Sequence, residues 1–540
     1  MAEILNLNDF SGCSDMERIE KALEKAREMP GSTLVIPPGD YLLTTDRAVE
    51  TMHHAVEGIY GENPEDTMFR AEYAFSTGIR LFGHDGTTIR AYGARFHVLG
   101  FMQVMSMEHC RHTSVEGLTI DYVRKPYSRG CITEYAVTDP EAHAGYMEVE
   151  FAPEFPVTEH TVMPRYCVYD FRNSRFNLQM KMQSREYLGG QRYRFSMTRM
   201  PDRTMAGEEF YVWHSFHFRP AILIEHSGGI RLQDVTIHSQ PGMGVVGHRS
   251  RDITLRGLRV IPAPDEHMST NTDATHFTSC RGKLIFDRCE FEGHGDDATN
   301  VHTFYHNIRP DGPRSYVGSV DVRTHSLTPD YPDEGDEMEL VDKRSLKKLA
   351  VYHVLKSELH PEDGTYTAEL DGELPPDASE RCWLSDVSQI PEVLFTRCTA
   401  KNHWARSVLL KTRHVEVSHC VFIGSAMQAI HIAPEAWWRE GVACSDILIS
   451  HNRFYLCGLS GHPDTAGRLP EAGGVKIEMS AEAPEGCGQQ DIRIENNLFM
   501  LPGVQYAVSI KNARNVTLRD NRYIGCEAPV FLRDCEEVRT

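Results

Sequence analysis

A short pattern of alternating apolar and polar positions recurs along the chain. It reads apolar, any, apolar, any, any, apolar or Asn, any, and apolar or aromatic. Clear copies begin at Ile230, Ile253, Leu284, Val393, Val415, Ile447, Ile492 and Val516, with a weaker copy at Thr113. Alternation with period two followed by a turn is typical of short β-strands. The pattern therefore predicts an all-β chain.

The spacing of the copies predicts how the strands are stacked. Consecutive copies begin 23 residues apart at 230 and 253, 22 apart at 393 and 415, and 24 apart at 492 and 516. A fixed period near two dozen residues, with one strand pair per repeat, indicates a solenoid. A leucine-rich repeat would add a leucine ladder and a helical segment, and the chain shows neither. We therefore predict a parallel β-helix.

The sixth position of the pattern carries a distinctive set of residues. In successive copies it is occupied by Cys289, Cys398, Cys420, Asn452, Asn497 and Asn521. In a β-helix, residues at one repeat position stack as internal ladders, and Asn amides bond from rung to rung. We expect these cysteines to fill the core and to be neither catalytic nor disulfide-bonded.

The N-terminal segment predicts a capping helix. Ser14-Asp-Met-Glu17 reads as a capping box, and Met16, Ile19, Leu23 and Ala26 form an apolar stripe at helical spacing. A helix over the first rung would cover an otherwise open edge.

Two stretches interrupt the repeat and predict β-rich, barrel-like insertions. They cover residues 123–220 and 305–390. The remaining parts are the N-terminal cap and first rungs (1–122), the rungs between the insertions (221–304), and the C-terminal rungs (391–540).

Composition narrows the classes of partner. The chain has 540 residues, of which 41% are hydrophobic, and its 77 acidic against 56 basic residues give a net charge of −21. That charge argues against nucleic acids, anionic membranes and polyanionic substrates. No apolar run reaches 18 residues, no Cys/His cluster has metal-site spacing, and the oligomeric state is unknown. Without a secretory signal we expect a cytoplasmic protein, or a secreted or periplasmic one if an N-terminal segment has been removed.

The candidate chemistry lies between Gly293 and His302, where Asp296 and Asp297 are adjacent, with Asp273 upstream. Strands that follow successive repeats at a constant offset place four polar residues in one register. We expect an outward column of Asp273, Asp297, Arg406 and Gln428, about 4.8 Å apart from rung to rung.

Asp296 is the residue before Asp297, which occupies the column position. In a regular strand Asp296 would therefore point to the opposite side. The flanking Gly293 and Gly295 favour a bend that turns both acids outward. Carboxyl groups this close must differ in pKa, so that one keeps a proton while another is ionised. Glycoside hydrolysis requires such a pair. Three tryptophans after the acids are candidate sugar platforms: Trp404, Trp437 and Trp438.

These residues resemble known families. Asn271-Thr-Asp273, the paired acids and Gly293-His-Gly295 look like the triple-aspartate site of the polygalacturonase-like right-handed β-helix hydrolases. Three longer segments are more similar to glycoside hydrolase family 110, the α-1,3-galactosidases. They are Gly295-Asp-Asp-Ala-Thr-Asn-Val-His302, Arg406 to Lys411-Thr412, and Pro434-Glu-Ala-Trp-Trp438.

The resemblance implies a right-handed parallel β-helix and an inverting exo-glycosidase without metal or cofactor. Such an enzyme releases terminal α-1,3-linked galactose, including from blood group B type glycans. Asp296 would be the general acid, and Asp273 and Asp297 would position and deprotonate water. Implied sugar contacts are Asn300, His302, Arg406, Lys411, Glu435 and Trp438.

Other interpretations stay open from the sequence. A different β-helix glycosidase, such as a polygalacturonase-like enzyme, would need an open groove. A polysaccharide lyase would bind Ca²⁺ at the acids and use Arg406 or Lys411 as base. A third possibility is a glycan-binding β-helix without catalysis. Arg406 could also serve only as an ion pair bracing Asp297.

Overall fold

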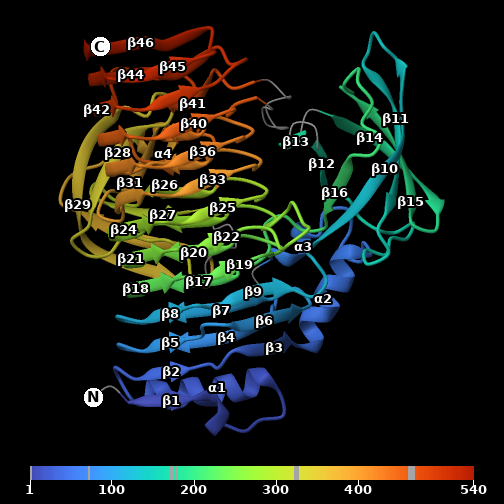
Figure 1. Ribbon diagram of the computed structural model, residues 1–540. Helices are drawn as coiled ribbons and strands as arrows, with labels where there is room; N and C mark the ends of the chain where they lie inside the picture. The colour runs from blue at the N-terminus through green and yellow to red at the C-terminus, as the bar shows by residue number, and fades with distance from the viewer. Residues whose placement is uncertain (1–2, 71–72, 171–174, 178–179, 321–327, 460–468) are drawn as a thin grey trace.

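The computed structural model describes residues 3–70, 73–170, 175–177, 180–320, 328–459 and 469–540. Its centre is the predicted parallel β-helix, a column of turns from the N-terminus to the C-terminus (Figure 1). Each turn contributes strands to three faces, and each strand pairs in parallel with its equivalent in the next turn. The described chain is therefore all-β apart from a few short helices, as the repeat pattern predicted.

The first face carries the site described below. Its strands are β4 (Thr77–Phe82), β7 (Gln103–Glu108), β17 (Ile222–Glu225), β20 (Val245–His248), β23 (Thr275–Thr278), β26 (Thr299–Pro310), β34 (Val408–Leu410), β37 (Ile430–Ile432), β41 (Ala472–Ile477), β44 (Tyr506–Arg519) and β46 (Ala528–Arg539).

The second face consists of β1 (Ile4–Asn6), β2 (Thr33–Val35), β5 (Thr88–Arg90), β8 (Ser114–Glu116), β18 (Gly228–Gln233), β21 (Arg251–Arg256), β24 (Arg281–Asp287), β32 (Glu392–Thr396), β35 (Arg413–Ser418), β39 (Ser445–Ser450) and β42 (Gln489–Glu495). The third face consists of β3 (Gly39–Thr44), β6 (Ala94–Leu99), β9 (Thr119–Tyr122), β19 (Thr236–Ile237), β22 (Arg259–Val260), β25 (Glu290–Glu292), β33 (Thr399–Lys401), β36 (Val421–Ile423), β40 (Arg453–Tyr455), β43 (Leu498–Met500) and β45 (Arg522–Ile524).

Identical or similar side chains stack from turn to turn inside the solenoid. The Phe454 and Phe499 rings stack with centroids 4.5 Å apart. The Asn497 amide donates to Asn521 Oδ1 at 3.0 Å, and the Asn452 amide donates to Asn497 Oδ1 at 3.1 Å. The predicted asparagine ladder is confirmed. The cysteines of the same ladder are buried thiols without disulfide partners, also as predicted.

Within the described residues, four short helices accompany the strands. They are α1 (Asp15–Arg27), α2 (Asp46–Val56), α3 (Glu65–Met68) and α4 (Ala378–Arg381), with a 3₁₀ turn η1 (Leu7–Asp9). Ser14 caps α1 by accepting from the Glu17 N–H at 3.2 Å, and α1 lies at the N-terminal end of the column (Figure 1). Ile19 and Leu23 of α1 join the main core. No helix in the described ranges is long and apolar enough to cross a membrane.

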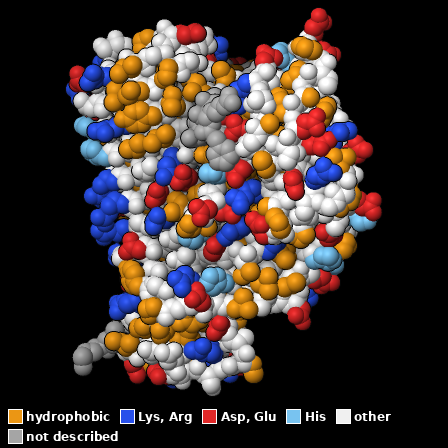
Figure 2. Space-filling model, turned by 45° about the vertical axis from the view of Figure 1, so that its right-hand side comes forward, with side chains coloured by type: hydrophobic (Ala, Val, Ile, Leu, Met, Phe, Trp, Pro, Cys, Tyr) orange, Lys and Arg blue, Asp and Glu red, His pale blue; other side chains and the backbone are white. Residues whose placement is uncertain are grey.

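The first insertion is an antiparallel sheet beside the column. It comprises β10 (Tyr127–Asp139), β11 (Ala144–Phe151), β12 (Arg165–Asp170), β13 (Arg175–Asn177), β14 (Lys181–Gly189), β15 (Arg192–Thr198) and β16 (Glu209–Trp213). Figure 2 shows charged side chains of both signs gathered between this sheet and the solenoid.

The second insertion grows directly out of β26, which spans 12 residues and extends beyond the site face. Antiparallel pairs lead from β26 through β27 (Ser315–Ser319), β30 (Thr365–Leu370), β29 (Lys348–His360), β28 (Glu337–Asp342) and β31 (Cys382–Asp386) and back to β26. A strand of the site face thus continues into the insertion.

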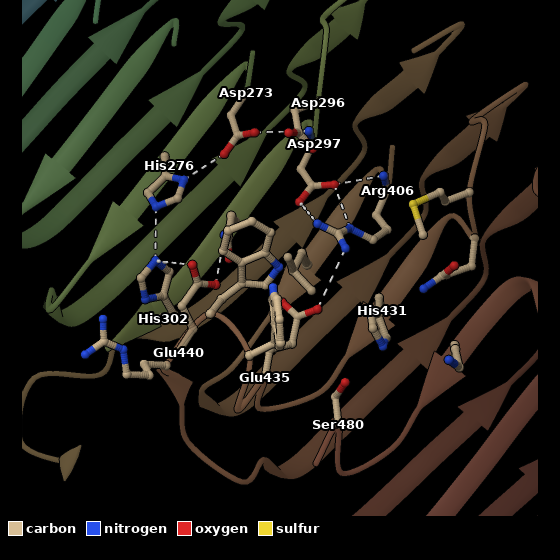
Figure 3. A pocket seen from close by; sticks show the side chains of 18 of the residues that line it. Asp273, His276, Asp296, Asp297, His302, Arg406, His431, Glu435, Glu440 and Ser480 are labelled. Atoms are coloured by element: carbon tan, nitrogen blue, oxygen red, sulfur yellow. Dashed lines mark hydrogen bonds and ion pairs between the residues drawn. The ribbon is translucent and has the colours of Figure 1, made fainter. Parts of the chain in front are cut away.

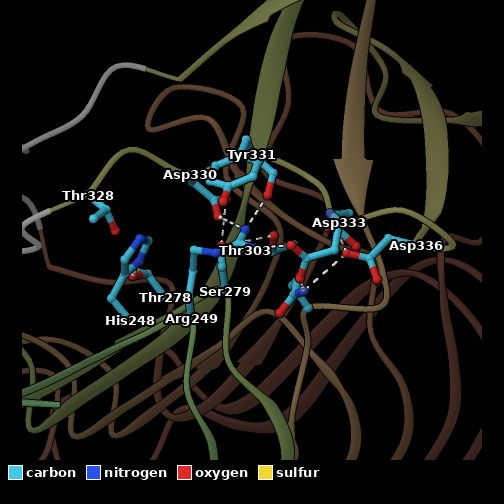
Figure 4. Close-up of polar contacts among 12 residues, drawn as sticks. His248, Arg249, Thr278, Ser279, Thr303, Thr328, Asp330, Tyr331, Asp333 and Asp336 are labelled. Atoms are coloured by element: carbon cyan, nitrogen blue, oxygen red, sulfur yellow. Dashed lines mark hydrogen bonds and ion pairs between the residues drawn. The ribbon is translucent and has the colours of Figure 1, made fainter. Parts of the chain in front are cut away.

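Ion pairs of the buried Arg249 hold the second insertion against the solenoid (Figure 4). Arg249 of a first-face turn contacts Asp330 at 3.2 Å and Asp333 at 2.7 Å, and Ser279 donates to Asp330 at 2.7 Å. His306, and to a smaller extent Arg249, hold the pKa of the buried Asp330 carboxyl far below its usual range despite its burial. The insertion is therefore fixed beside the site face.

Candidate active site

A pocket of about 730 Å³ opens over the first face where β23, β26, β34, β37 and β41 follow one another. The predicted acids Asp273, Asp296 and Asp297 lie together in it (Figure 3). Outward-facing polar side chains line its floor, and side chains from the insertions and from a turn after β37 form its walls.

The predicted column is present. Strand pairing places His276 opposite Asn300, Asn300 opposite Leu409, and Leu409 opposite His431. Three residues earlier in each turn, the same register aligns Asp273, Asp297, Arg406 and Gln428. A direct contact agrees with it, because the Asp297 N–H donates to Asp273 Oδ1 at 3.1 Å.

Arg406 holds the Asp297 carboxylate from two sides. Its backbone N–H and its Nε donate to Asp297 Oδ1, each at 2.8 Å, and its Nη2 donates to Oδ2 at 2.7 Å. Burial alone would favour the protonated acid, but the guanidinium outweighs it and lowers the pKa of Asp297. Asp297 is accordingly the ionised member of the acid cluster.

Asp296 faces the pocket, as the glycine-flanked bend predicted. A Cβ on Gly295 would lie 2.1 Å from the Asn271 carbonyl oxygen, and Gly293 has φ +67°, so both positions require glycine. Within the described chain the Asp296 carboxyl has no hydrogen-bond or ion-pair partner. Burial, then the charge of Asp297 and the nearby Asp273 carboxyl group, raise its pKa well above the usual range. Asp296 therefore keeps its proton beside an ionised neighbour.

Asp273 forms the start of a line of hydrogen bonds. Its Oδ2 lies 2.6 Å from His276 Nδ1, and His276 Nε2 lies 3.0 Å from His302 Nε2. Because His302 Nδ1 donates to the Thr303 carbonyl, its Nε2 must accept from His276 when His302 is neutral. Burial lowers the pKa of both histidines to about 4, and burial with the Asp297 charge raises that of Asp273. A protonated Asp273 donating to neutral His276 satisfies all three residues.

Lys411 lies beneath the pocket and does not line it. Its side chain is 0% exposed, and Nζ contacts Glu440 at 2.5 Å, Glu435 at 2.9 Å and Asn300 Oδ1 at 3.1 Å. The sequence predicted a direct sugar contact for Lys411, but the structure places its ammonium among these buried partners and outside the pocket lining. Asn300, His302, Arg406 and Glu435 do line the pocket.

The three tryptophans fall in different places. Trp404 is buried and packs edge-on against Trp213 with ring centroids 4.3 Å apart, so it is part of a core and not a platform. Trp437 and Trp438 line the pocket and are 88% and 43% exposed. Of the three, Trp437 and Trp438 are therefore the ones placed at the pocket.

Several pocket residues were missed from the sequence. Arg165, at the start of β12, lies over the Phe216 ring at 4.2 Å and belongs to the first insertion, so no repeat register points to it. Glu440 lies beyond a turn and carries no pattern either. His276 could have been found, since it occupies the outward position one turn before Asn300.

The three aspartates also have the donor set of a hard cation, with one oxygen from each lying within 4.8 Å of the others. Arg406 already binds both oxygens of Asp297. A cation would therefore have to share that carboxylate with a guanidinium.

No family model matches the chain. Among curated proteins it is similar to alpha-1,3-galactosidase B of Bacteroides thetaiotaomicron, with 22% identity over 97% of this chain and 87% of the relative. Alpha-1,3-galactosidase A of Bacteroides fragilis is 24% identical over 89% of this chain and 80% of the relative. Alpha-1,3-galactosidase B of Phocaeicola vulgatus is 29% identical over 44% and 42%. The resemblance indicated by the sequence motifs is thus confirmed over most of the chain.

Among solved structures, the A-module of mannuronan C-5 epimerase AlgE4 from Azotobacter vinelandii aligns with a TM-score of 0.40 at 10% identity, covering 99% of this chain and all of that one. The family 28 exopolygalacturonase of Yersinia enterocolitica aligns with a TM-score of 0.40 at 10% identity, covering 100% and 78%.

Proposed function

We propose that the protein is an exo-acting, inverting glycoside hydrolase that releases terminal α-1,3-linked galactose from oligosaccharides or glycoconjugates. The observation that carries the proposal is the geometry of the acid pair. Arg406 binds both oxygens of Asp297 and lowers its pKa, whereas the adjacent Asp296 carboxyl has no hydrogen-bond partner in the described ranges and has a raised pKa. Similarity to curated α-1,3-galactosidases over most of the chain supports the choice of sugar.

In this mechanism Asp296 donates its proton to the glycosidic oxygen as the bond breaks. Asp297 carries the negative charge that stabilises the oxocarbenium-like transition state, and it orients and deprotonates the attacking water. Asp273 lies next to Asp297 in the column and positions the same water. General acid catalysis of this kind contributes roughly 10²–10⁴-fold in rate.

The acids lie closer together than is usual for an inverting enzyme. Oxygens of the three carboxyls lie within 4.8 Å, whereas acid–base separations are roughly 5–5.5 Å in retaining and 6.5–9.5 Å in inverting enzymes. A retaining enzyme also needs a carboxylate free to bond carbon. Both oxygens of Asp297 receive hydrogen bonds from Arg406, and both oxygens of Asp273 are hydrogen-bonded as well. These bonds favour the activation of water over covalent attack.

The charge of the pocket favours a neutral sugar over a uronic acid. Seven acidic residues line it against four Lys or Arg, and two of those cations, Arg406 and Lys476, already pair with carboxylates. A polygalacturonase-like activity would need cations free to bind each carboxylate of its substrate.

A lyase mechanism is disfavoured because neither Arg406 nor Lys411 is suited to act as its base. Such an enzyme needs a neutral Arg or Lys that reaches the substrate. Neighbouring carboxylates, opposing the effect of burial, raise the pKa of Arg406 and of Lys411, and Lys411 is covered by its partners.

The deciding experiment is time-resolved ¹H NMR of the products from an α-1,3-galactosyl disaccharide. Initial release of β-galactose is expected. Initial α-galactose would exclude inversion, an unsaturated product with loss of activity in chelator would indicate a lyase, and binding without turnover would indicate a lectin-like protein. Asp296→Asn is the matched control and should lose turnover while its far-UV spectrum is unchanged.

A further inference from the structure

The rim of the pocket carries an unusually exposed tryptophan. Trp437 is 88% exposed, the most of any large hydrophobic side chain in the described ranges, and it lines the pocket. No other described side chain stacks on its ring. A tryptophan side chain can bury 150–250 Å² of surface, so leaving one open to water forgoes a large stabilisation. Such exposure at a pocket rim calls for a ligand that covers it.

Trp437 lies on the turn between Glu435 and Glu440, whose backbone is held in place by hydrogen bonds. The turn is closed by the Glu435 N–H donating to the Glu440 carbonyl at 2.8 Å and by the reverse bond at 3.1 Å. On one side the Ala436 N–H donates to the Ser480 carbonyl at 3.0 Å. On the other the Tyr305 N–H of β26 donates to a carbonyl of the turn at 2.8 Å. The tryptophan is therefore presented by a fixed support and not by a loose loop.

The side chains at both ends of the turn anchor it to the acid cluster. Glu435 and Glu440 share the buried Lys411 ammonium, at 2.9 Å and 2.5 Å. Glu435 Oε1 also lies 3.8 Å from Nη1 of Arg406, the residue that holds Asp297. The position of Trp437 is thus tied to the position of the reacting carboxylates.

The short chain between Glu435 and Trp437 limits the distance between these two residues. Trp437 is two residues beyond Glu435, so their Cα atoms are at most about 7 Å apart. The Trp437 side chain and the three aspartates line the same pocket, so one oligosaccharide can contact both. A pyranose offers an apolar C–H face of the size of the indole, and a rigid aromatic ring binds such a face at little entropic cost.

We propose that Trp437 is the stacking platform for the sugar that carries the terminal galactose, on the leaving-group side of the cleaved bond. This inference rests on the proposed galactosidase function. It assigns the enzyme a preference for neutral oligosaccharides over galactosides whose leaving group is not a sugar. Because the leaving group is bound next to the proton donor, the platform also aligns the glycosidic oxygen with Asp296.

The test compares two substrates that differ only in the leaving group. For an α-1,3-galactosyl disaccharide, Trp437→Ala should lower kcat/KM about tenfold or more, mainly through KM, and Trp437→Phe should recover part of the loss. For α-galactosyl fluoride, which has no second sugar, the same variants should stay within about twofold of wild type. Phe82→Ala, which removes an exposed ring far from the pocket, is the control and should change neither rate.

The outcomes separate the platform from the function. If the Trp437 variants lose kcat/KM equally on both substrates, or lose none on the disaccharide, the assignment of Trp437 as the platform is wrong. The galactosidase function would then still stand. Failure of the wild-type protein to hydrolyse either substrate would overturn the function and the platform together. A titration of Asp296→Asn protein with the disaccharide gives an independent readout, since its tryptophan fluorescence should change and the change should vanish on adding Trp437→Ala.

Discussion

Arg406 and Asp297 are joined by three hydrogen bonds, two from the Arg406 side chain and one from its backbone N–H, all between 2.7 and 2.8 Å. The two residues occupy successive turns of the solenoid, so the parallel register itself delivers the guanidinium to the carboxylate. This pair keeps one acid of the cluster ionised and thereby divides the roles of the adjacent aspartates.

Removing the guanidinium should shift the pH dependence. In Arg406→Gln the pKa of Asp297 should rise, because burial remains while the compensating charge is lost. The base would then be protonated at higher pH, and the acidic limb of the kcat/KM profile should move upward. A profile that keeps its acidic limb would show that Asp297 is not the group that must be ionised.

The same pair contributes to stability in a defined pH window. The folded-state pKa of Asp297 is depressed, so its stabilisation is present above the unfolded pKa and is lost as pH falls through the folded value. Arg406→Gln leaves a buried carboxylate unpaired and should cost about 3–5 kcal/mol near neutral pH. The difference in free energy of unfolding from wild type should shrink in acid, as measured by urea titration at several pH values.

The general acid should be distinguishable by its leaving-group dependence. Asp296→Asn should lose about 10²–10⁴-fold on the disaccharide, whose leaving oxygen needs a proton. The loss on α-galactosyl fluoride should be much smaller, since fluoride leaves with little proton assistance. Similar losses on both substrates would assign Asp296 a role other than proton donation.

Arg165 offers a test on the alkaline side. Burial and the neighbouring carboxylates raise the pKa of Asp296, and Arg165 is among the cations that oppose this rise. In Arg165→Gln the pKa of Asp296 should therefore increase further, and the alkaline limb of kcat/KM should move to higher pH. An unchanged limb would mean that the group titrating there is not Asp296.

Lys411 should contribute to the stability of the fold. Lys411→Met leaves Glu435 and Glu440 buried without their ammonium, which should cost about 3–5 kcal/mol. The exposed Lys347, 3.8 Å from Glu485, is the control, and Lys347→Met should change the free energy of unfolding by less than about 1 kcal/mol. Comparable effects in chemical denaturation would contradict the buried-network interpretation.

Much of the fold and part of the site could be predicted because both follow from a repeat. The alternation of residues such as Ile492 and Ile494 fixes which side chains face inward, and the two-dozen period fixes which turns are neighbours. Once register is known, Asp273, Asp297 and Arg406 must form a column. The assignment of reaction roles, the stereochemical outcome and the barrel-like form of the insertions stay predictions.

Residues outside the repeat could not be placed in this way. Trp404 was expected near a sugar and is instead packed on Trp213 of the first insertion. Lys411 shares an outward strand position with pocket residues, yet the turn that ends at Glu440 covers it. Arg165 reaches the pocket from a segment more than a hundred residues earlier in the chain.

The sequence by itself determined the solenoid, its register and the meeting of three aspartates with an arginine, because each depends only on local alternation and a constant period. Tertiary structure alone decided which polar side chains remain open to a ligand. That outcome depends on how two insertions and one clamped turn close over the face, and these contacts between distant segments leave no periodic trace in the chain.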